Sequence, residues 1–382
     1  METEKNILIV AGEASGDLHA ASLVHAIKES YPGLNFFGLG GKRLKLEGVD
    51  LYCDLVELAV VGFWEVLKNL KKFRSIFYGL LQETDKVKPD LAILVDYPGF
   101  NLRLAKELKK RGTPIIYYIS PQVWAWGAGR IKAIKQLVER MIVILNFEEP
   151  LYKNEGIPVS FVGHPLLDTV KLQMDKAALF KKMGLDLNSR GIALLPGSRE
   201  KEVKKILPVM LETAGIIRKS LDENICFLIL QAETVKQEIF DEILAKYTLQ
   251  VKVVPEMTYE GIAASDYCMV ASGTATLETA ILGTPMVILY KVSFLTWLYL
   301  KMVIKVPFIG LVNLMRGEKF IAEFVQYHAR PRRIARHIIN DLKDPQKLKR
   351  IKQQLAEVKA TLGEPGASRR AAEIVIQHLK AK

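Results

Sequence analysis

The sequence of 382 residues is poor in cysteine. Its three cysteines, Cys53, Cys226 and Cys268, are far apart and lack the paired spacing of zinc ligands or of a disulfide framework. We therefore expect reduced thiols in the core of a cytosolic protein. The start, METEKN, runs directly into an apolar segment with no basic region before it and no small-residue cleavage site after it, so no signal peptide is predicted.

An uninterrupted hydrophobic run long enough to cross a membrane is also missing. The best candidate, residues 292–312, is broken by Lys301, Lys305 and Pro307. Because a lysine at the centre of a spanning helix costs about 2.5–3.5 kcal/mol, we predict that this segment does not span a bilayer. Two alternatives stay open for it: a buried helix followed by a loop, and a hydrophobic surface that dips into lipid.

Two motifs that hold nucleotide diphosphates are absent as well. No Asp-x-Asp pair among apolar neighbours could hold a metal-bound diphosphate, so we expect no metal site. In the segment ILIVAGEASGDL, residues 7–18, Gly12 and Gly16 lie four apart with no third glycine at the offset of the dinucleotide-binding pattern.

The overall composition is that of an ordinary globular protein, with 25% charged and 49% apolar residues. The length allows a sizeable core and favours two domains. A net charge of +12 favours anionic partners such as nucleic acid, anionic lipid or phosphorylated substrates. Nucleic acid is the least favoured of these, because the lysines are dispersed and accompanied by acids rather than clustered among aromatic residues.

Short apolar runs alternate with longer helical patterns along the chain, as in parallel sheets joined by right-handed crossovers. The alternation restarts at Gly191 after the polar segment 171–190, so we predict an α/β protein with two doubly wound domains and a ligand cleft between them. The predicted strands are residues 6–11, 35–38, 91–96, 114–119, 141–145, 160–162, 191–195, 226–230, 251–254, 267–271 and 285–290.

The first predicted strand leads through a turn of small residues into a helix, which is where α/β proteins build ligand sites. Glu13 and Asp17 would repel a diphosphate from this helix N-terminus. The segment is either a tight turn with Asp17 as a first-turn acid, or a site for a neutral, hydroxyl-rich ligand such as a sugar. In the second case Glu13, Ser15, Gly16 and Asp17 are the candidate contacts.

Asp96 ends another apolar strand and precedes Tyr97-Pro98-Gly99. A carboxylate at the carboxyl end of a strand can act as a general base in a cleft. The alternative is a simple turn residue, because aspartate is common before turns. Asn101 is predicted to be a polar helper or a helix cap.

The segment LLPGSREKEV, residues 194–203, contains a strand, a tight turn and a charged helix start. The backbone N–H groups around Gly197 and Ser198, joined by Arg199, would form a cradle for a diphosphate. A plain turn with a solvent-exposed arginine is the alternative.

The segment ASGTATLE, residues 271–278, repeats this geometry. Its hydroxyl and N–H groups at Ser272, Gly273 and Thr274 suit phosphate oxygens. Glu278 falls in the first turns of the following helix, where a carboxylate can accept both ribose hydroxyls. A mere first-turn acid is the alternative.

Residues 63–81 place apolar side chains at helical spacing, with Lys68, Lys71, Lys72 and Arg74 on other faces. Such a helix can lie in a membrane interface, and a helix packed on its own sheet would show the same period.

Seven segments together resemble lipid-A-disaccharide synthase. In order, from residue 11 to about 314, they are AGEASGDLHAASL, DYPGFN, SPQVWAW, FVGHPL, LLPGSRxxEV, ASGTATLE and PMVxxY followed by VNL. The resemblance implies a glycosyltransferase of the B-type fold, with two facing Rossmann-like domains, that inverts configuration and needs no metal or cofactor. It implies transfer of 2,3-diacylglucosamine from UDP-2,3-diacylglucosamine to 2,3-diacylglucosamine 1-phosphate (lipid X), giving lipid A disaccharide 1-phosphate and UDP.

The resemblance also implies roles for single residues. Asp96 matches the base that deprotonates the acceptor 6-hydroxyl, Arg199 the arginine that handles the diphosphate, and Glu278 the acid that contacts the nucleotide. Asn313, in LVNL, matches a polar residue of the family and is assigned to the donor site. Some members carry a second acid where this chain has Gly99, so that acid is not essential here.

For the whole chain, the resemblance implies an acceptor-side domain at residues 1–168, with helices of about 345–382 packing back on it. A UDP-sugar-binding domain follows at 169–344. It further implies a peripheral protein at the cytoplasmic face of the inner membrane of Gram-negative bacteria, where the basic, apolar segments 63–81 and 292–312 would contact phospholipid. A homodimer, with or without exchange of the C-terminal segment, is left open.

Overall fold

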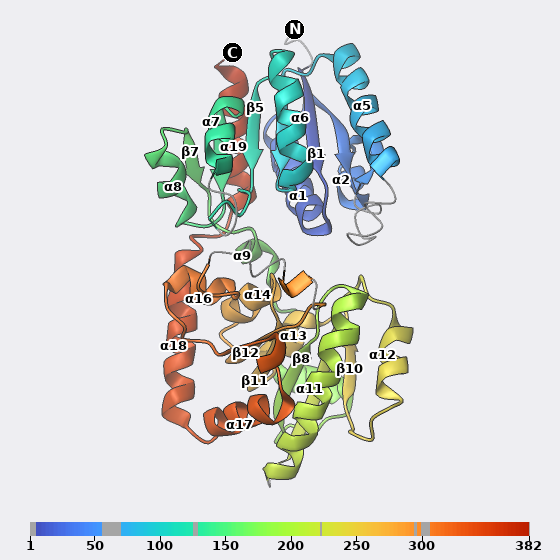
Figure 1. Ribbon diagram of the computed structural model, residues 1–382, viewed down its shortest axis with the longest axis vertical. Coiled ribbons are helices and arrows are strands. Elements are labelled where there is room, and N and C mark those ends of the chain that lie inside the picture. Colours follow the sequence, from blue (N-terminus) through green and yellow to red (C-terminus); the bar gives the residue numbers. More distant parts are fainter. Residues whose placement is uncertain are drawn as a thin grey trace. The chain divides into compact units, whose positions relative to one another are not determined.

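The computed structural model describes residues 5–55, 70–124, 129–221, 224–293, 296–298 and 306–381. They divide into two compact units (Figure 1). The first unit runs to Asp168 and resumes at Leu362, and the second unit is Thr169–Thr361. Each is an α/β unit built on a parallel sheet.

In the described part of the first unit, seven parallel strands have the order β3-β2-β1-β4-β5-β6-β7. The order in which strands are added to the sheet reverses between β1 and β4. At such a point the loops after the carboxyl ends of the two strands leave room for a ligand. The strands are β1 (Lys5–Ala11), β2 (Leu34–Gly40), β3 (Asp50–Asp54), β4 (Leu91–Val95), β5 (Ile115–Tyr118), β6 (Arg140–Val143) and β7 (Val159–Phe161).

Six parallel strands make up the sheet described in the second unit, in the order β10-β9-β8-β11-β12-β13. Here the order of the strands reverses between β8 and β11. The strands are β8 (Arg190–Leu195), β9 (Ile225–Gln231), β10 (Lys252–Pro255), β11 (Tyr267–Ala271), β12 (Met286–Tyr290) and β13 (Glu323–Val325).

Helices lie on both faces of each sheet (Figure 1). The first unit contains α1 (Ala14–Ser30), α2 (Lys42–Leu46), α5 (Leu70–Val87), α6 (Pro98–Lys110), α7 (Gly129–Leu137), α8 (Glu148–Asn154) and α19 (Ala367–Lys380), with α9 (Leu166–Thr169) at the boundary. The second contains α10 (Lys176–Met183), α11 (Glu200–Ser220), α12 (Gln237–Leu244), α13 (Thr258–Ala263), α14 (Ala275–Ile281), α16 (Leu311–Arg316), the short 3-10 helix η1 (Gln326–His328), α17 (Pro331–Leu342) and α18 (Pro345–Thr361).

The central strands are apolar throughout because both of their faces are covered. All five residues of β4, LAILV, are buried. Ala92 and Leu94 pack into the core formed with α5, α6, α7 and α8, and the alternation of side chains along a strand turns Ile93 to the other face. In the second unit α11, α12 and α17 cover one face of the sheet in the same way.

The C-terminal segment returns to the first unit later in the chain than the sequence predicts. Helix α18 packs against α14, α16 and α17 of the second unit. Only the residues from Leu362 on belong to the first unit, where α19 packs against α1. The predicted return to the first domain from about residue 345 is therefore wrong for α18, whose buried Ile351, Leu355 and Val358 face the second unit.

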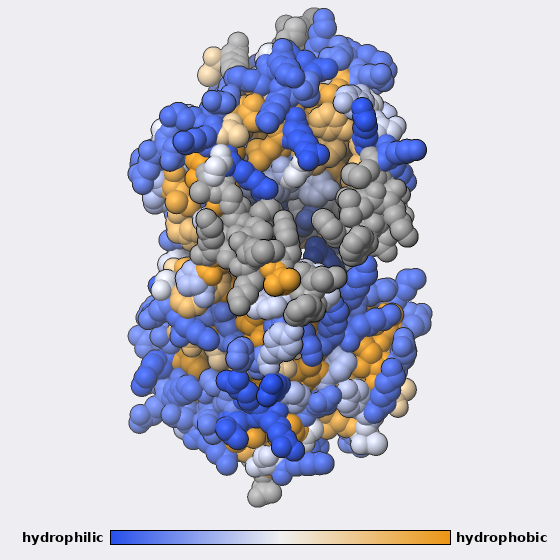
Figure 2. All heavy atoms as spheres, viewed as in Figure 1, coloured by the Kyte–Doolittle hydropathy of each residue, from blue (hydrophilic) through white to orange (hydrophobic). Residues whose placement is uncertain are grey.

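Of the four strands at the edges of the described sheets, β3 and β13 are missing from the predicted set, whereas β7 and β10 overlap the predicted strands 160–162 and 251–254. β3 is only partly buried, and β13 is three residues long. Neither has the continuous apolar run by which central strands are found, because an edge strand has one neighbour and a more exposed face. On the face seen in Figure 2, hydrophilic side chains cover most of the surface that is coloured, in agreement with the charged composition.

Candidate functional site

Asp96 lies in a strained turn directly after β4. Asp96 and Tyr97 both have left-handed backbone conformations, with φ of +46° and +47°. Such conformations are unfavourable for residues other than glycine and occur mainly where the surrounding structure enforces them. The backbone carbonyl of Asp96 accepts hydrogen bonds from the Tyr117 hydroxyl (2.5 Å) and from Asn101 Nδ2 (2.8 Å). The turn is thereby held in one conformation.

The environment of Asp96 changes its acidity. Burial, with a smaller contribution from the negative charge of Glu13, raises the pKa of Asp96 to about 6, although a hydrogen bond from the Tyr97 backbone opposes the shift. A carboxylate with a pKa close to neutral is well suited to accept a proton, since it is largely ionised at pH 7 and still basic.

Asn101 is placed beside this turn, but it holds the turn rather than facing a ligand. Its side chain has no exposed surface, and its amide group donates to the carbonyl oxygens of Val95 and Asp96. The assignment of Asn101 to acceptor binding is therefore corrected to a positioning role.

The first turn of α1 lies next to Asp96, because β1 and β4 are neighbours in the sheet. Ser15 is exposed and Glu13 is partly exposed, so both can meet a ligand. Gly16 is buried, and a Cβ there would lie 3.8 Å from the Cβ of Ala11, an ordinary van der Waals contact, so packing does not require glycine at this position.

Asp17 has a different function from the predicted sugar contact. It is 4% exposed, and its carboxylate accepts hydrogen bonds from the backbone N–H groups of Gly41 (2.7 Å), Arg43 (3.0 Å) and Leu44 (3.3 Å). A carboxylate at these groups satisfies the free N–H donors at the start of α2 and favours the helix dipole. Asp17 is thus an anchor between α1 and α2, and the prediction that it binds the acceptor is wrong.

A second acid in the first unit was not anticipated. Glu148, in the first turn of α8, is 2% exposed and accepts a hydrogen bond from Trp124 Nε1 (3.1 Å). Burial raises the pKa of Glu148 to about 8, so this carboxyl group is mostly protonated at pH 7. Nothing in the sequence marks it, because its burial depends on the segment SPQVW after β5 folding over α8.

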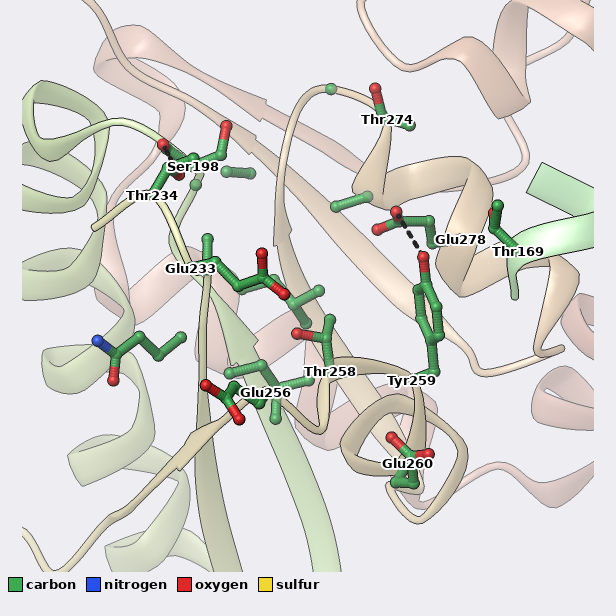
Figure 3. Close-up of a pocket in the computed structure, with 18 of the residues that line it drawn as sticks. Thr169, Ser198, Glu233, Thr234, Glu256, Thr258, Tyr259, Glu260, Thr274 and Glu278 are labelled. Carbon is green, nitrogen blue, oxygen red and sulfur yellow. Dashed lines mark hydrogen bonds between the residues drawn. The ribbon is translucent and has the colours of Figure 1, made fainter. Parts of the chain in front are cut away.

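A pocket of about 690 Å³ lies in the second unit, at the carboxyl ends of its central strands. Figure 3 shows its walls, which come from the loops after β8, β9, β10 and β11 and from α13 and α14. Five of the described lining residues are glutamates and one is a lysine, Lys171. The glutamates are Glu202, Glu233, Glu256, Glu260 and Glu278. An anionic ligand here needs donors from the backbone and a cation nearby.

The predicted diphosphate loop forms one wall of this pocket. Gly197 and Ser198 line it, and Gly197 has φ of +122°. A Cβ at Gly197 would lie 2.6 Å from Glu202 Oε2, so glycine is required. The N–H of Ser198 donates to that same oxygen (3.3 Å). The loop thus already holds a carboxylate at an N–H group suited to an anion.

Arg199 follows Ser198 at the N-cap of α11. Its side chain is 68% exposed, with Nη1 3.6 Å from Glu202 Oε1, and it is not among the described residues that line the pocket. The loops are held together by Thr234, whose hydroxyl donates to the carbonyl oxygen of Ser198 (2.6 Å).

The second predicted loop forms another wall. Ser272, Gly273 and Thr274 all line the pocket, between β11 and α14. The backbone N–H of Ser272 bonds to Leu289, and its hydroxyl donates to the carbonyl oxygen of Ile309 (3.3 Å). Thr274 is exposed at the start of α14.

Glu278 lines the pocket one helical turn further on. Burial raises the pKa of Glu278, and a hydrogen bond with Tyr259 lowers it. The Tyr259 hydroxyl lies 3.5 Å from Glu278 Oε1, drawn as the dashed line in Figure 3. Tyr259 is another lining residue that sequence reasoning missed, since a single tyrosine in a helix carries no signal of its own.

Asn313, on α16, does not reach the pocket surface. It has no exposed surface and makes four hydrogen bonds inside the protein: it donates to Ile321 and Glu323, and it accepts from the N–H groups of Phe320 and Ile321. The prediction of direct donor contact is wrong. Because Glu323 also accepts from the N–H groups of Ile309 and Gly310, Asn313 supports the carbonyl group to which Ser272 donates.

The two amphipathic segments, 63–81 and 292–312, are described only in part. Residues 56–69, 294–295 and 299–305 lie outside the described residues. In the described part of the first, α5 buries Ile76, Leu80 and Leu81 against its own sheet, with Phe73 and Phe77 partly buried there. Packing on the sheet therefore accounts for the apolar face of the helix from residue 70 on, while Lys71, Lys72 and Arg74 are exposed.

Two further features are absent from the described residues. No helix in that part of the chain has the length and apolar character needed to cross a membrane. Over the same residues, no group of three or more histidine, cysteine, aspartate or glutamate side chains is arranged to hold a metal ion.

Solved structures with the same architecture include the UDP-GlcNAc 2-epimerase from Neisseria meningitidis bound to UDP-GlcNAc, with a TM-score of 0.62 at 13% identity over 99% of this chain and 100% of that chain. CalG4, the calicheamicin glycosyltransferase, has a TM-score of 0.59 at 11% identity over 99% of both chains. At such identities the likeness shows the fold alone, which is the B-type fold of two Rossmann-like domains.

Closer similarity is found in sequence. A family model described as lipid-A-disaccharide synthetase matches residues 7–378. The lipid-A-disaccharide synthase of Syntrophus aciditrophicus (strain SB) is 48% identical over 380 residues, 98% of each chain. Lipid-A-disaccharide synthase 1 of Legionella pneumophila (strain Philadelphia 1) is 43% identical over 384 residues, 100% of each chain. The chain therefore belongs to the lipid-A-disaccharide synthetase family and is a glycosyltransferase.

Proposed function

We propose that this enzyme transfers 2,3-diacylglucosamine from UDP-2,3-diacylglucosamine to the 6-hydroxyl of 2,3-diacylglucosamine 1-phosphate. The family membership supports the reaction, and the arrangement around Asp96 is the observation that carries the mechanism. The products are lipid A disaccharide 1-phosphate and UDP. The two ligands would use different units of the chain.

In this mechanism Asp96 removes the proton from the acceptor hydroxyl. The oxygen forms a bond to the anomeric carbon of the donor while the bond from that carbon to the UDP oxygen breaks, and the electron pair leaves with UDP. Attack from the face opposite the leaving group inverts the anomeric configuration. The raised pKa of Asp96 supports this role, as do the exposed Ser15 and partly exposed Glu13 beside it, which we assign to the acceptor sugar.

The donor nucleotide is assigned to the pocket of the second unit. The backbone N–H groups of Gly273 and Thr274 would donate to the diphosphate, and so would that of Ser198 if a phosphate oxygen displaces the Glu202 carboxylate. Arg199 would be the cation that offsets the glutamates of the pocket. Glu278 would accept the ribose hydroxyls. Gly197 and Gly273 let the backbone come close to the phosphates.

The reaction is tested by mixing the purified enzyme with UDP-2,3-diacylglucosamine and 2,3-diacylglucosamine 1-phosphate, and measuring UDP release with and without a chelator. We expect one disaccharide per UDP and no effect of the chelator. Release of UDP without a disaccharide, or interconversion of UDP-GlcNAc epimers as the principal activity, would contradict the proposal.

We further propose that the enzyme binds peripherally to the inner membrane, since both substrates carry acyl chains and the net charge is +12. Exchange of Lys68 and Lys71 for glutamate should weaken sedimentation with phosphatidylglycerol vesicles, whereas the same exchange at the exposed Lys109 and Lys110 on α6 should not. Equal binding of both variants would exclude a role for segment 63–81. Light scattering tests the homodimer, which would double the mass of 43.0 kDa.

A further inference from the structure

Tyr259 and Glu278 reach the same part of the pocket from two different helices. Tyr259 is the second residue of α13, and Glu278 lies in the middle of α14. Both line the pocket, and in Figure 3 the phenol ring of Tyr259 extends toward the carboxylate of Glu278. Their oxygens are 3.5 Å apart, at the long limit of a hydrogen bond.

The position of α13 is determined by its packing. Gly261 lies so close to β9 that a Cβ there would come within 2.3 Å of Leu230 Cδ2. Glu260 is 6% exposed and accepts a hydrogen bond from the backbone N–H of Gln173 (2.9 Å). The helix therefore cannot shift toward or away from the sheet without loss of these contacts, and the phenol group of Tyr259 keeps its place.

Helix α14 is held by its packing against α16, α18 and β11. Thr276 and Thr279 have no exposed surface, and their hydroxyls donate to the carbonyl oxygens of Gly273 (2.8 Å) and Ala275 (2.7 Å). The backbone that carries Glu278 is thus rigid, so the remaining freedom belongs to the side chain of Glu278 itself. Its rotamer decides whether both carboxylate oxygens face a ligand.

We propose that Tyr259 is a positioning residue for the nucleotide ribose: its hydroxyl donates to Glu278 Oε1 and orients the carboxylate to accept the vicinal ribose hydroxyls, so that the pocket selects ribonucleotides over 2′-deoxyribonucleotides. The inference rests on the proposed function, which assigns the nucleotide to this pocket. It adds a residue, and a specificity, that the resemblance of the sequence does not supply.

The protonation states agree with this role. Burial, with a contribution from the Glu278 charge, raises the pKa of Tyr259 to about 12, so its hydroxyl keeps a proton to donate at neutral pH. Burial disfavours the ionised form of Glu278 and the phenol favours it. Only the ionised carboxylate is free to accept two hydroxyl donors, and hydrogen bonds to a charged acceptor are the stronger ones.

The test compares ligands as well as variants. Calorimetry would give dissociation constants of UDP and 2′-deoxy-UDP for the full-length enzyme, Tyr259→Phe and Glu278→Gln. We expect the unsubstituted enzyme to bind UDP about 10- to 100-fold more tightly than 2′-deoxy-UDP, because the deoxy ligand leaves a charged acceptor unpaired. In Tyr259→Phe this preference should fall to about threefold or less, with 2′-deoxy-UDP binding almost unchanged.

Kinetics provides a second measurement that a merely structural role would not reproduce. Tyr259→Phe should raise KM for the UDP-sugar donor while kcat stays within about twofold, since the ribose is remote from the bond that breaks. Tyr247→Phe, at a partly buried tyrosine beyond α12, is the matched control and should change neither quantity. Melting curves of all variants would establish that each is folded.

The outcomes separate this inference from the proposed function. If UDP is preferred by the unsubstituted enzyme, the preference disappears in Glu278→Gln, and Tyr259→Phe retains it, then the role of Tyr259 is overturned while the nucleotide pocket stands. If UDP does not bind, or Glu278→Gln leaves the ribose preference intact, both the ribose assignment and the role of Tyr259 are overturned.

Discussion

The two units place different chemistry at the same topological position. In the first, the order of the parallel strands reverses between β1 and β4, and Glu13 and Asp96 follow those strands. In the second the reversal lies between β8 and β11, followed by the Gly197-Ser198 and Ser272-Gly273 turns. The first position holds two acids, of which Asp96 lies in a strained turn, and the second holds turns of small residues that line a pocket.

This difference follows from residue type rather than from fold. A left-handed, hydrogen-bonded turn buries Asp96 and raises its pKa to about 6, which suits proton transfer. Glycine at 197 and 273 keeps side chains away from the backbone, which suits close approach of an anion. The same sheet thus supports a base in one unit and an anion site in the other, and the following substitutions test that division.

The largest effect is expected for Asp96→Asn. Asparagine keeps the shape of the side chain but cannot accept the proton, so kcat should fall about 10²–10⁴-fold. The dissociation constant of UDP should stay within about twofold, because the nucleotide is assigned to the other unit. Asp50→Asn, at an exposed position of β3, serves as the control. Near-normal turnover of Asp96→Asn would exclude Asp96 as the base.

A smaller effect is expected for Arg199→Ala, which should lower the affinity for the donor nucleotide alone. Removal of a charged hydrogen-bond donor to a diphosphate should weaken UDP binding about 10- to 100-fold. The exposed Lys205, on the same helix, gives the control Lys205→Ala, which should alter UDP affinity by less than about twofold. An effect of Arg199→Ala on the acceptor KM alone would contradict the division between the units.

Gly12→Ala tests the turn of the first unit without removal of an acid. A Cβ at Gly12 would lie 2.2 Å from Cδ1 of the Tyr97 ring, so the ring and the adjoining Asp96 must shift. Because small misplacements of a reacting group are costly, we expect about a tenfold loss in kcat with UDP binding unchanged. Gly99→Ala, where a Cβ meets nothing within 4 Å, should be neutral. Equal activity of the two variants would show that the position of this turn is not critical.

The dependence of kcat/KM on pH follows from the pKa of Asp96, which is about 6. The base acts in its ionised form, so activity should be nearly maximal at pH 7 and fall as the pH drops through 6. At pH 5 it should be about tenfold lower. A profile that stays flat between pH 5 and 7 in the unsubstituted enzyme would argue against a base with this environment.

Glu148→Gln should affect stability rather than activity, and it is the smallest expected effect. The folded-state pKa of Glu148, about 8, lies above the ordinary value of 4.5, so its stabilising contribution is present below pH 4.5 and lost as the pH rises through 8. Glutamine does not titrate, so the Glu148→Gln variant does not lose stability in this way as the pH rises. Its melting temperature should rise relative to that of the unsubstituted enzyme by a few degrees between pH 6 and pH 8. If the difference in melting temperature between the two proteins is the same at pH 6 and pH 8, a buried, protonated Glu148 is contradicted.

Much of the fold could be predicted, because central parallel strands are continuous apolar runs. The predicted strands at 91–96 and 267–271 match β4 and β11 within one residue. The edge strands β3 and β13 were missed because they bury little. The candidate loops were found from glycine, serine and acidic residues in their turns, since such turns need those residue types.

The roles of single residues within those loops were harder to predict from the sequence. Asp17 and Glu13 are equally acidic in sequence, yet Asp17 is occupied by the N-terminus of α2 and Glu13 stays near Asp96. Asn313 lies in a motif shared with the family, but its four hydrogen bonds are all internal. Which polar side chains meet a ligand depends on partners that are far apart along the chain.

The sequence by itself determined the α/β class, the two sheets and the turns that could hold a sugar or a diphosphate, because these follow from local periodicity and turn chemistry. Tertiary structure alone decided that Asp96 has a raised pKa, that Asp17, Asn101 and Asn313 are structural, and that Tyr259 meets Glu278. The physical reason is that burial and hydrogen bonding between distant segments set the charge and the freedom of each side chain, and neither is encoded at a single position.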